Sequence, residues 1–170
     1  MCVAAISGFK SANGITFNSD KTELYLADMF DKSISTYSRN PTTGELRHQK
    51  TLRIWHAVDN LKFDNESGNI YAGTANSLFG WFMLFPPTGS HVSSNVGGVT
   101  EISRILVDGE KRDWAQRDLI VTNKLNGISG GLKMQNQILV GSFNSDGYLV
   151  CPFNNSIKPE FSKFKKVNSK

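Results

Sequence analysis

Two stretches, "NGITFNSDKTELYLAD" (13–28) and "DNLKFDNESGNIYAG" (59–73), follow one plan and decide the fold of this chain. In each, an Asn or Asp opens a short run of alternating apolar and polar residues. A turn rich in Asn, Asp, Ser and Gly follows, and then a second apolar run. Alternation with period two predicts β-strands, and those turn residues favour tight connections. The plan therefore predicts strand–turn–strand units.

A third copy of the plan, "GGLKMQNQILVG" (130–141), comes later in the chain. Units of short strands that repeat at about 40–50 residues are typical of β-propeller blades. A longer stretch, roughly residues 86–125, separates the second copy from the third. Within it "VTEISRILVDGE" (99–110) alternates as a strand, and we expect it to be the outer strand of a blade, with a short helix as the alternative.

The length of the chain limits the number of blades to about three, because 170 residues hold no more at this spacing. Closed propellers have roughly four to eight blades, and three would leave sheet edges open. We therefore expect an all-β fold that is an incomplete propeller ring. Either partner chains complete the ring, or the chain is the C-terminal half of a longer protein. The expected organisation is a partial β-propeller domain over 1–153 and a basic C-terminal tail over 154–170.

Composition excludes several other classes. A hydrophobic content of 39% and a charged content of 20% are those of an ordinary globular domain rather than a disordered chain. No apolar run is long enough for a membrane span, and "MCVAAISGF" (1–9) is a poor signal peptide that reads better as a strand. Much of the net charge of +4 lies in the tail. No nucleic-acid partner is expected, and the tail allows at most weak contact with an anionic membrane or lipoprotein surface.

Polar residues directly precede two predicted inner strands. Asn13 precedes the first, and Asp59 and Asn60 precede the second, so blade geometry would point them at a common axis. One carboxylate and two amide oxygens suit a hard cation, and the relaxed geometry of Ca²⁺ suits them better than the tight octahedron of Mg²⁺. Gly130 and Gly131 occupy the matching positions in the third unit and would offer the cation only backbone groups as ligands. The alternative is that these Asx residues cap turns by bonding their own backbone.

The same segments resemble the serum paraoxonase/arylesterase family, a group of six-bladed, calcium-dependent propeller enzymes. "FKSANGITFNSDKTELYLADMFDKSISTYSR", "VDNLKFDNESGNIYAG", "QILVGSF" and "YLVC" carry the resemblance, which runs from about residue 3 to Cys151. It implies hydrolysis of small aryl esters, lactones or organophosphates at a calcium ion that is held partly by Asn13, Asp59 and Asn60. It also implies a secreted, extracellular protein and a disulfide from Cys151 to a family cysteine with which Cys2 does not align.

The chain departs from the family pattern in several places. The remaining calcium ligands and the histidine pair of the family precede the segments that match, so the catalytic residues stay unassigned. His48 lies in a predicted polar turn, His56 at a strand edge three residues before Asp59, and His91 in a loop. The segment "TANSLFGWF" (74–82) is more apolar than the family pattern, and its Phe79, Trp81 and Phe82 would line a pocket or, as we favour, an inter-blade core.

Two sequons, at Asn65 and Asn154, support a secreted glycoprotein weakly. With about three of the 6–8 oxygens that calcium takes, we expect the isolated chain to bind calcium weakly and to be inactive as an esterase. The alternatives are a non-catalytic propeller fragment and a relative of gluconolactonase-like or strictosidine-synthase-like propellers. Open blade edges also allow self-association.

Overall fold

The fold was analysed in a computed structural model, which describes residues 5–75, 97–107, 111–125, 127–143, 145 and 147–153. These residues form three antiparallel sheets, which we call blades 1, 2 and 3. Blade 1 contains β1 (Ala12–Phe17), β2 (Glu23–Asp28), β3 (Ser33–Arg39) and β4 (Leu46–Arg53), in that order. Blade 2 contains β5 (Ala57–Phe63), β6 (Ile70–Ala75), β7 (Gly97–Val107) and β8 (Lys111–Thr122). Blade 3 contains β9 (Ile128–Met134), β10 (Gln137–Ser142) and β11 (Leu149–Pro152).

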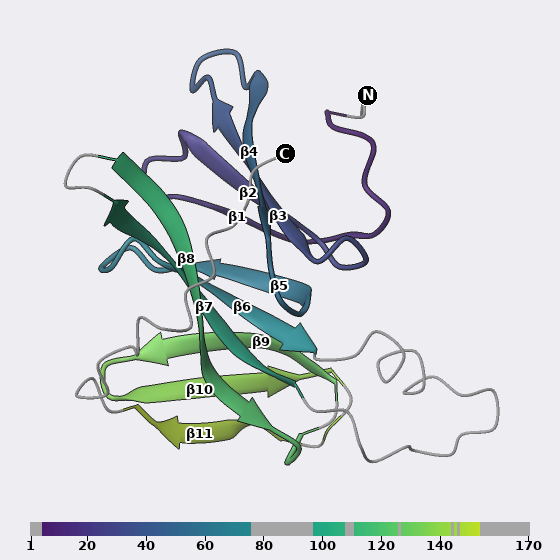
Figure 1. The fold of residues 1–170 in the computed structure, drawn as a ribbon, viewed down its shortest axis with the longest axis vertical. Helices are drawn as coiled ribbons and strands as arrows, with labels where there is room; N and C mark the ends of the chain where they lie inside the picture. Colours follow the sequence, from purple (N-terminus) through teal and green to yellow (C-terminus); the bar gives the residue numbers. More distant parts are fainter. Residues whose placement is uncertain are drawn as a thin grey trace.

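The blades follow one another in chain order (Figure 1), from purple and blue through teal and green to yellow-green. The first strands of the blades are neighbours, because β1 lies beside β5 and β5 lies beside β9. This arrangement confirms the expected fold class, an all-β propeller piece of three blades.

Most of the core of the described residues lies in two apolar layers, each between a pair of blades, and a smaller cluster consists of Met29, Ala57 and Ala75. The first layer joins side chains from blades 1 and 2, among them Tyr25, Ile34, Leu61 and Ile70. The second joins blades 2 and 3. Its buried members are Tyr71, Val99, Leu125, Ile128, Ile138 and Val140. Consecutive residues of β6 serve different layers, since Ile70 faces blade 1 while Tyr71 faces blade 3. This explains the apolar strands of the repeat: both faces of a middle strand are covered.

The predicted turns lie where the sequence put them. The β5–β6 turn is closed by hydrogen bonds from the Asp64 N–H to the Asn69 carbonyl (2.9 Å) and from the Gly68 N–H to the Asp64 carbonyl (2.9 Å). Gly68 has φ 72, in the left-handed region that favours glycine.

One prediction about blade 2 is wrong. The segment 99–110 was expected to be an outer strand, but most of it lies in β7, the third strand, and β8 forms the outer edge. The two strands make a long hairpin in which Val107 pairs with Lys111 and Gly97 with Thr122. The stretch that separates the second and third copies of the plan thus supplies two of the four strands of blade 2.

Some predictions fall on residues outside the described ranges. They concern Cys2, His91, the apolar trio 79, 81 and 82, the sequon at Asn154 and the tail 154–170. The proposed division of the chain at residue 153 therefore stays a prediction. Within the part of the chain that the structure describes, we find no helix long and apolar enough to cross a membrane.

Candidate metal centre

Each of the three inner strands is irregular at the same place. In β1 the register shifts between Ala12 and Ile15, and in β5 between Val58 and Leu61. In β9 the shift lies where Ile128 and Gly130 face β10. A β-bulge adds a residue to one strand of a pair and re-aims its side chains, and bulges are frequent next to functional sites. The bulges hold Asn13–Gly14, Asp59–Asn60 and Ser129, so all three predicted ligands lie on bulges.

The strand register gives the structural alignment of the two motifs. Ala12 pairs with Asp28 as Val58 pairs with Thr74, so the structural counterpart of Asn13 is Asp59. The counterpart of Asn60 is then Gly14. Alternation alone does not reveal this match, because a bulge shifts a strand by one residue without changing its apolar pattern.

Close backbone contacts bring the bulges together. A Cβ added to Gly14 would overlap the Asp59 carbonyl oxygen, so only glycine lets β1 approach β5 here. On the other side, a Cβ at Gly130 would lie 3.9 Å from the Asn60 Cβ. The structure thus gathers Asn13, Asp59 and Asn60 at one end of the inner strands, with Gly130 beside them. Whether they bind a metal stays a prediction.

The Asp59 carboxyl is the charged group of this cluster. Burial raises the pKa of Asp59 to about 6, and a hydrogen bond with the Asn13 side chain opposes that rise. The Asn13 amide also lies 3.9 Å from the Met29 sulfur. Within the described ranges, Asp59 forms no ion pair with Lys, Arg or His. A half-buried carboxyl without a cation fits a bound divalent ion, which would stabilise its charged form.

The donor set is nevertheless small. No group of three or more His, Cys, Asp and Glu side chains gathers among the described residues. The cluster offers one carboxylate and the two amide oxygens of Asn13 and Asn60, both of which are exposed. Oxygen donors of this kind suit calcium, but these three groups supply at most about half of its usual 6–8 ligands.

Asp28, which pairs with Ala12 beside the first bulge, holds the chain that leads into it. Its side chain is buried and accepts hydrogen bonds from the N–H groups of Lys10 (2.8 Å), Ser11 (3.2 Å) and Asp31 (3.2 Å). Burial alone would raise the pKa of Asp28, but these backbone donors together lower it. Asp28 therefore fixes the segment just before Asn13.

A different polar chain supports the second bulge. Thr74, the counterpart of Asp28, lies 3.3 Å from the Thr100 hydroxyl, which donates to Asp118 (2.7 Å). The other Asp118 oxygen lies 2.9 Å from His56 Nε2. Burial acts to raise the pKa of Asp118, yet the hydrogen bonds from His56 and Thr100 and the His56 charge lower it. His56 is thus tied to the outer strand β8, three residues before Asp59.

The other predicted residues lie apart from this cluster. His48, placed in a polar turn from the sequence, lies instead on β4, where it contacts Thr51 (2.9 Å). Cys151 on β11 carries a free thiol packed against the core between blades 2 and 3, and its predicted disulfide stays untested. Asn65 lies in the β5–β6 turn, where it accepts a hydrogen bond from Ser19 (3.0 Å).

Sequence reasoning missed Asp28, Thr74, Thr100 and Asp118. One signal was present for Asp28, because the second apolar run of the first unit ends in a carboxylate, in "LAD". Nothing in the sequence ties Asp118 to His56, since these residues lie 62 positions apart. These supporting contacts can be identified only once the strand register within the blades is known.

Comparison with known proteins identifies the family. A family model described as arylesterase matches residues 2–105, more than half of the chain. The chain is 37% identical over 67 residues to "Serum paraoxonase/arylesterase 2" of Gallus gallus, covering 39% of this chain and 19% of the relative. It is 38% identical over 84 residues to the Bos taurus protein of that name, covering 48% of this chain and 23% of the relative. "Serum paraoxonase/lactonase 3" of Homo sapiens is 38% identical over 66 residues, covering 39% and 18%.

The matches thus span about a fifth of the length of these relatives. Among solved structures, the chain is similar to a putative 6-phosphogluconolactonase from Bacteroides uniformis, with a TM-score of 0.39 and 11% identity over 85% of this chain and 51% of that one. The family assignment does not depend on that likeness, since it follows from the sequence match over residues 2–105. The chain belongs to the arylesterase family.

Proposed function

We propose that the chain forms one wall of a calcium-dependent site that hydrolyses esters or lactones. One observation carries the proposal: matched bulges on β1 and β5 bring Asn13, Asp59 and Asn60 together, and the half-buried Asp59 carboxyl has no cationic partner among the described residues. The family match supports it, because the relatives carry the names arylesterase and lactonase. Small aryl esters, lactones and organophosphates are the proposed substrates.

Each residue has a distinct role in this proposal. Asp59 would give calcium its only charged protein ligand here, and Asn13 and Asn60 would add neutral oxygens. Asn13 also orients the Asp59 carboxyl through their hydrogen bond. A bound calcium ion polarises a carbonyl or phosphoryl oxygen and stabilises negative charge that develops on it.

The proposed calcium site is incomplete within this chain. Three oxygens fall short of the 6–8 that calcium prefers, so the other ligands have to come from water, backbone or another polypeptide. We therefore propose that the functional site is larger than this chain and that the chain alone turns over little or no ester. The alternative function is a non-catalytic propeller piece that keeps the fold without closing the metal site.

A second part of the proposal concerns the open face of blade 1. Ile15 and Phe17 on β1 are exposed, whereas their counterparts Leu61 and Phe63 on β5 pack against blade 1. We propose that this face associates with another blade, supplied by a second copy when only this chain is present. Size-exclusion chromatography with light scattering tests it: a monomer at all concentrations would contradict the proposal.

Three further properties are proposed from the family alone. The names of the relatives describe serum proteins, which supports secretion of this chain. Secretion would allow a glycan at Asn65, which lies in an exposed turn. It would also allow a disulfide at Cys151. Mass spectrometry of protein from a secretory host tests both modifications.

The deciding experiment is the melting temperature of the chain in calcium and in EDTA. A ligand that binds the folded state raises the melting temperature by mass action. We expect a calcium-dependent rise that Asp59→Ala abolishes and Glu66→Ala, an exposed carboxylate in the same blade, leaves intact. No rise in the wild type, or a rise that survives Asp59→Ala, would remove this cluster from the proposal.

Turnover of phenyl acetate separates the two functions. A pure chain that binds calcium but hydrolyses no ester fits the incomplete site. EDTA-sensitive turnover by the chain alone would show instead that the site needs no further polypeptide.

A further inference from the structure

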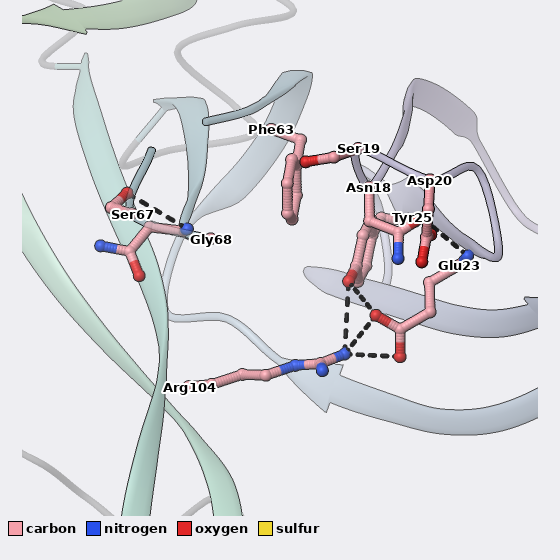
Figure 2. A pocket seen from close by; sticks show the side chains of 10 residues that line it. Asn18, Ser19, Asp20, Glu23, Tyr25, Phe63, Ser67, Gly68 and Arg104 are labelled. Atoms are coloured by element: carbon pink, nitrogen blue, oxygen red, sulfur yellow. Dashed lines mark hydrogen bonds and ion pairs between the residues drawn. The ribbon is translucent and has the colours of Figure 1, made fainter. Parts of the chain in front are cut away.

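A cavity lies between blades 1 and 2, at the end of the inner strands that is opposite to the bulges. Its volume is about 480 Å³. Blade 1 contributes the β1–β2 turn and two residues of β2, and blade 2 contributes the end of β5, the β5–β6 turn and Arg104. Figure 2 shows Phe63 and Arg104 reaching into this space from two sides. The size is in the range of small-molecule pockets.

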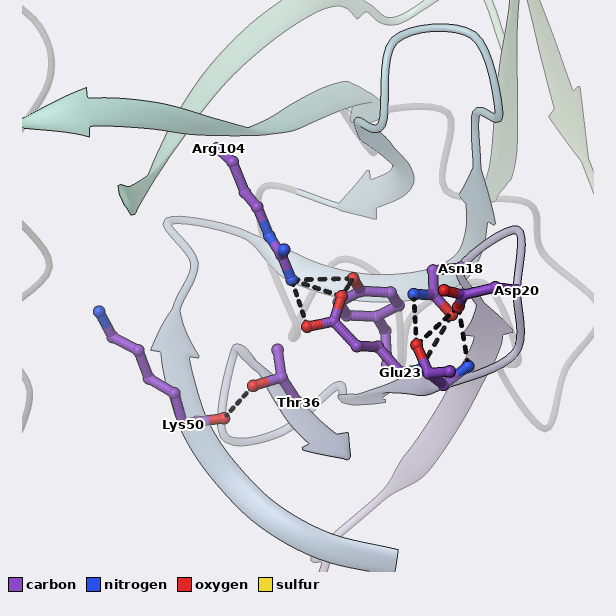
Figure 3. A network of polar contacts seen from close by, with 8 residues as sticks. Asn18, Asp20, Glu23, Thr36, Lys50 and Arg104 are labelled. Atoms are coloured by element: carbon purple, nitrogen blue, oxygen red, sulfur yellow. Dashed lines mark hydrogen bonds and ion pairs between the residues drawn. The ribbon is translucent and has the colours of Figure 1, made fainter. Parts of the chain in front are cut away.

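The floor of the cavity is built from mutually bonded side chains. Arg104 Nη2 lies 2.6 and 2.5 Å from the two carboxylate oxygens of Glu23 (Figure 3). It also lies 3.3 Å from the Tyr25 hydroxyl (Figure 2). The Tyr25 hydroxyl donates to Glu23 (2.7 Å), and the Arg104 guanidinium lies 4.7 Å from the centre of the Trp114 ring. These contacts hold Arg104 in place before any ligand arrives, which limits the entropy lost on binding.

The rim is ordered in the same way. Asn18 accepts from the Glu23 N–H (2.9 Å) and donates to the Thr22 hydroxyl (3.2 Å). Asp20 Oδ1 accepts from the Thr22 N–H (3.0 Å) and hydroxyl (2.6 Å). Across the cavity, the Asn69 amide nitrogen donates to Glu101 (2.7 Å).

These contacts use only part of the hydrogen-bonding capacity at the cavity. The hydrogen bonds of Arg104 to described residues use Nη2, so Nη1 and Nε keep donors with respect to that part of the chain. Asp20 bonds through Oδ1 and Asn69 through Nδ2, so an acceptor oxygen remains on each among the contacts of the described residues. A ligand here would meet donors on the floor and acceptors on the rim.

Charge and shape narrow the class of ligand. Glu23 and Arg104 neutralise each other, so Asp20 is left as the uncompensated charge and a strongly anionic ligand is disfavoured. Phe63 stacks on Tyr25, with ring centres 5.9 Å apart and planes 10° apart, and adds an apolar wall. Hydroxyl groups both donate and accept, so they match this mixed set of partners. We propose that this cavity binds a neutral sugar, with its C–H face on Phe63 and its hydroxyls on Arg104, Asp20 and Asn69.

A nitrogen-15 NMR titration of the chain with methyl glucoside, methyl galactoside and methyl mannoside tests the proposal. We expect shifts that saturate for at least one sugar and that cluster at residues 18–23 and 67–69 and at the Arg104 side chain. Glycerol serves as a control for non-specific polyol binding, and inorganic phosphate for anion binding.

Two variants remove the free groups and spare the fold. Arg104→Lys keeps the charge opposite Glu23 but loses the planar donors, and Asp20→Asn removes the negative charge of an exposed turn while keeping an acceptor oxygen for Thr22. Each should weaken sugar binding at least about fivefold. Arg47→Lys and Glu45→Gln make the same chemical changes in an exposed ion pair at the start of β4 and should change nothing. If Arg104→Lys fails to fold, the sugar affinity of Asp20→Asn alone tests the proposal.

Absence of saturable sugar shifts would overturn the proposal. Equal shifts with glycerol, stronger shifts with phosphate, or equal affinity in the cavity variants and the control variants would overturn it as well. The proposal does not depend on the calcium site, so calcium binding and sugar binding fail or succeed separately.

Discussion

Blade 1 and blade 2 place the same kind of residue at the same position but give it different surroundings. Ile15 and Leu61 are counterparts on β1 and β5, yet Ile15 is 58% exposed and Leu61 only 9%. Phe63 stacks on Tyr25 of the blade before it, while its counterpart Phe17 is 39% exposed. The strand pattern is equal in the two blades, and the difference comes from the neighbour: blade 2 has a blade before it within the described residues, and blade 1 has none.

The comparison shows that a blade does not bury its own apolar face. Its core is the layer shared with the next blade, so the apolar residues of one sheet are buried by another. Stability in such stacked repeats is expected to depend on nearest-neighbour interfaces.

The largest expected effect is at the buried member of the pair. Leu61→Ala removes a side chain from the layer between blades 1 and 2 and should lower the free energy of unfolding by about 2–4 kcal/mol. Ile15→Ala, the matched change on the open face, should cost less than about 0.5 kcal/mol. Urea unfolding at two protein concentrations measures both. An equal cost at high concentration alone would mean that a second copy covers Ile15.

The next effect concerns the polar supports of the bulges. Asp28→Ala deprives three backbone N–H groups of their acceptor and should cost about 2 kcal/mol, whereas Thr74→Ala loses a single hydroxyl contact and should cost about 1 kcal/mol. Thermal unfolding of the two variants gives the ranking. A loss of stability in Thr74→Ala as large as that in Asp28→Ala would contradict the expected difference between the two blades.

The lowered pKa of Asp28 also has a consequence for acid stability. Its folded pKa lies below the ordinary value of 3.8, so the folded state binds fewer protons than the unfolded state in that range. The stabilisation is present above the unfolded pKa and is lost as the pH falls through the folded pKa. Asp28→Asn should therefore have a shallower acid limb in a plot of stability against pH.

A smaller effect of opposite sign is expected at Asp59. The pKa of Asp59 is raised from 3.8 to about 6, so the folded state binds more protons and this group lowers stability as the pH rises between those values. In EDTA at pH 7.5, Asp59→Asn should be more stable than the wild type by about 1 kcal/mol once solvent screening is allowed for. Asn13→Ala is the comparison variant, because Asn13 on β1 is the counterpart of Asp59 on β5. A destabilised Asp59→Asn would identify the carboxylate as a structural cap.

The smallest effect is at the bond between the turns of blades 1 and 2. Ser19→Ala removes the exposed hydrogen bond to Asn65 and should change stability by less than about 0.5 kcal/mol. Ser38→Ala, which removes two exposed bonds within blade 1, to the Arg47 carbonyl and from the Gln49 side chain, is the control. Calorimetry of both variants tests whether a bond between blades is worth more than a bond inside one.

Much of this structure could be predicted from period-two alternation. The pattern located β1, β2, β5, β6, β9 and β10 with their turns, because each pairs with a strand next to it in sequence. It failed in the hairpin of β7 and β8, where no repeat marks which strand is outermost. It located the ligand candidates, but it could not show that they lie on β-bulges, which the strand pairing alone reveals. Asp28 and Asp118 escaped notice because their partners are chosen by the fold and not by the repeat.

The glycine of the first bulge has a consequence for how such a chain can change. Gly14 must lack a side chain, because a Cβ there would overlap the Asp59 carbonyl, yet the equivalent position of the next blade is Asn60. Copying the second motif into the first blade would therefore force an Asn into a space without room for it. The blades look like interchangeable modules, but their order in the chain is fixed. A gene duplication or shuffled repeat could not multiply the oxygen donors without first separating the strands that hold them.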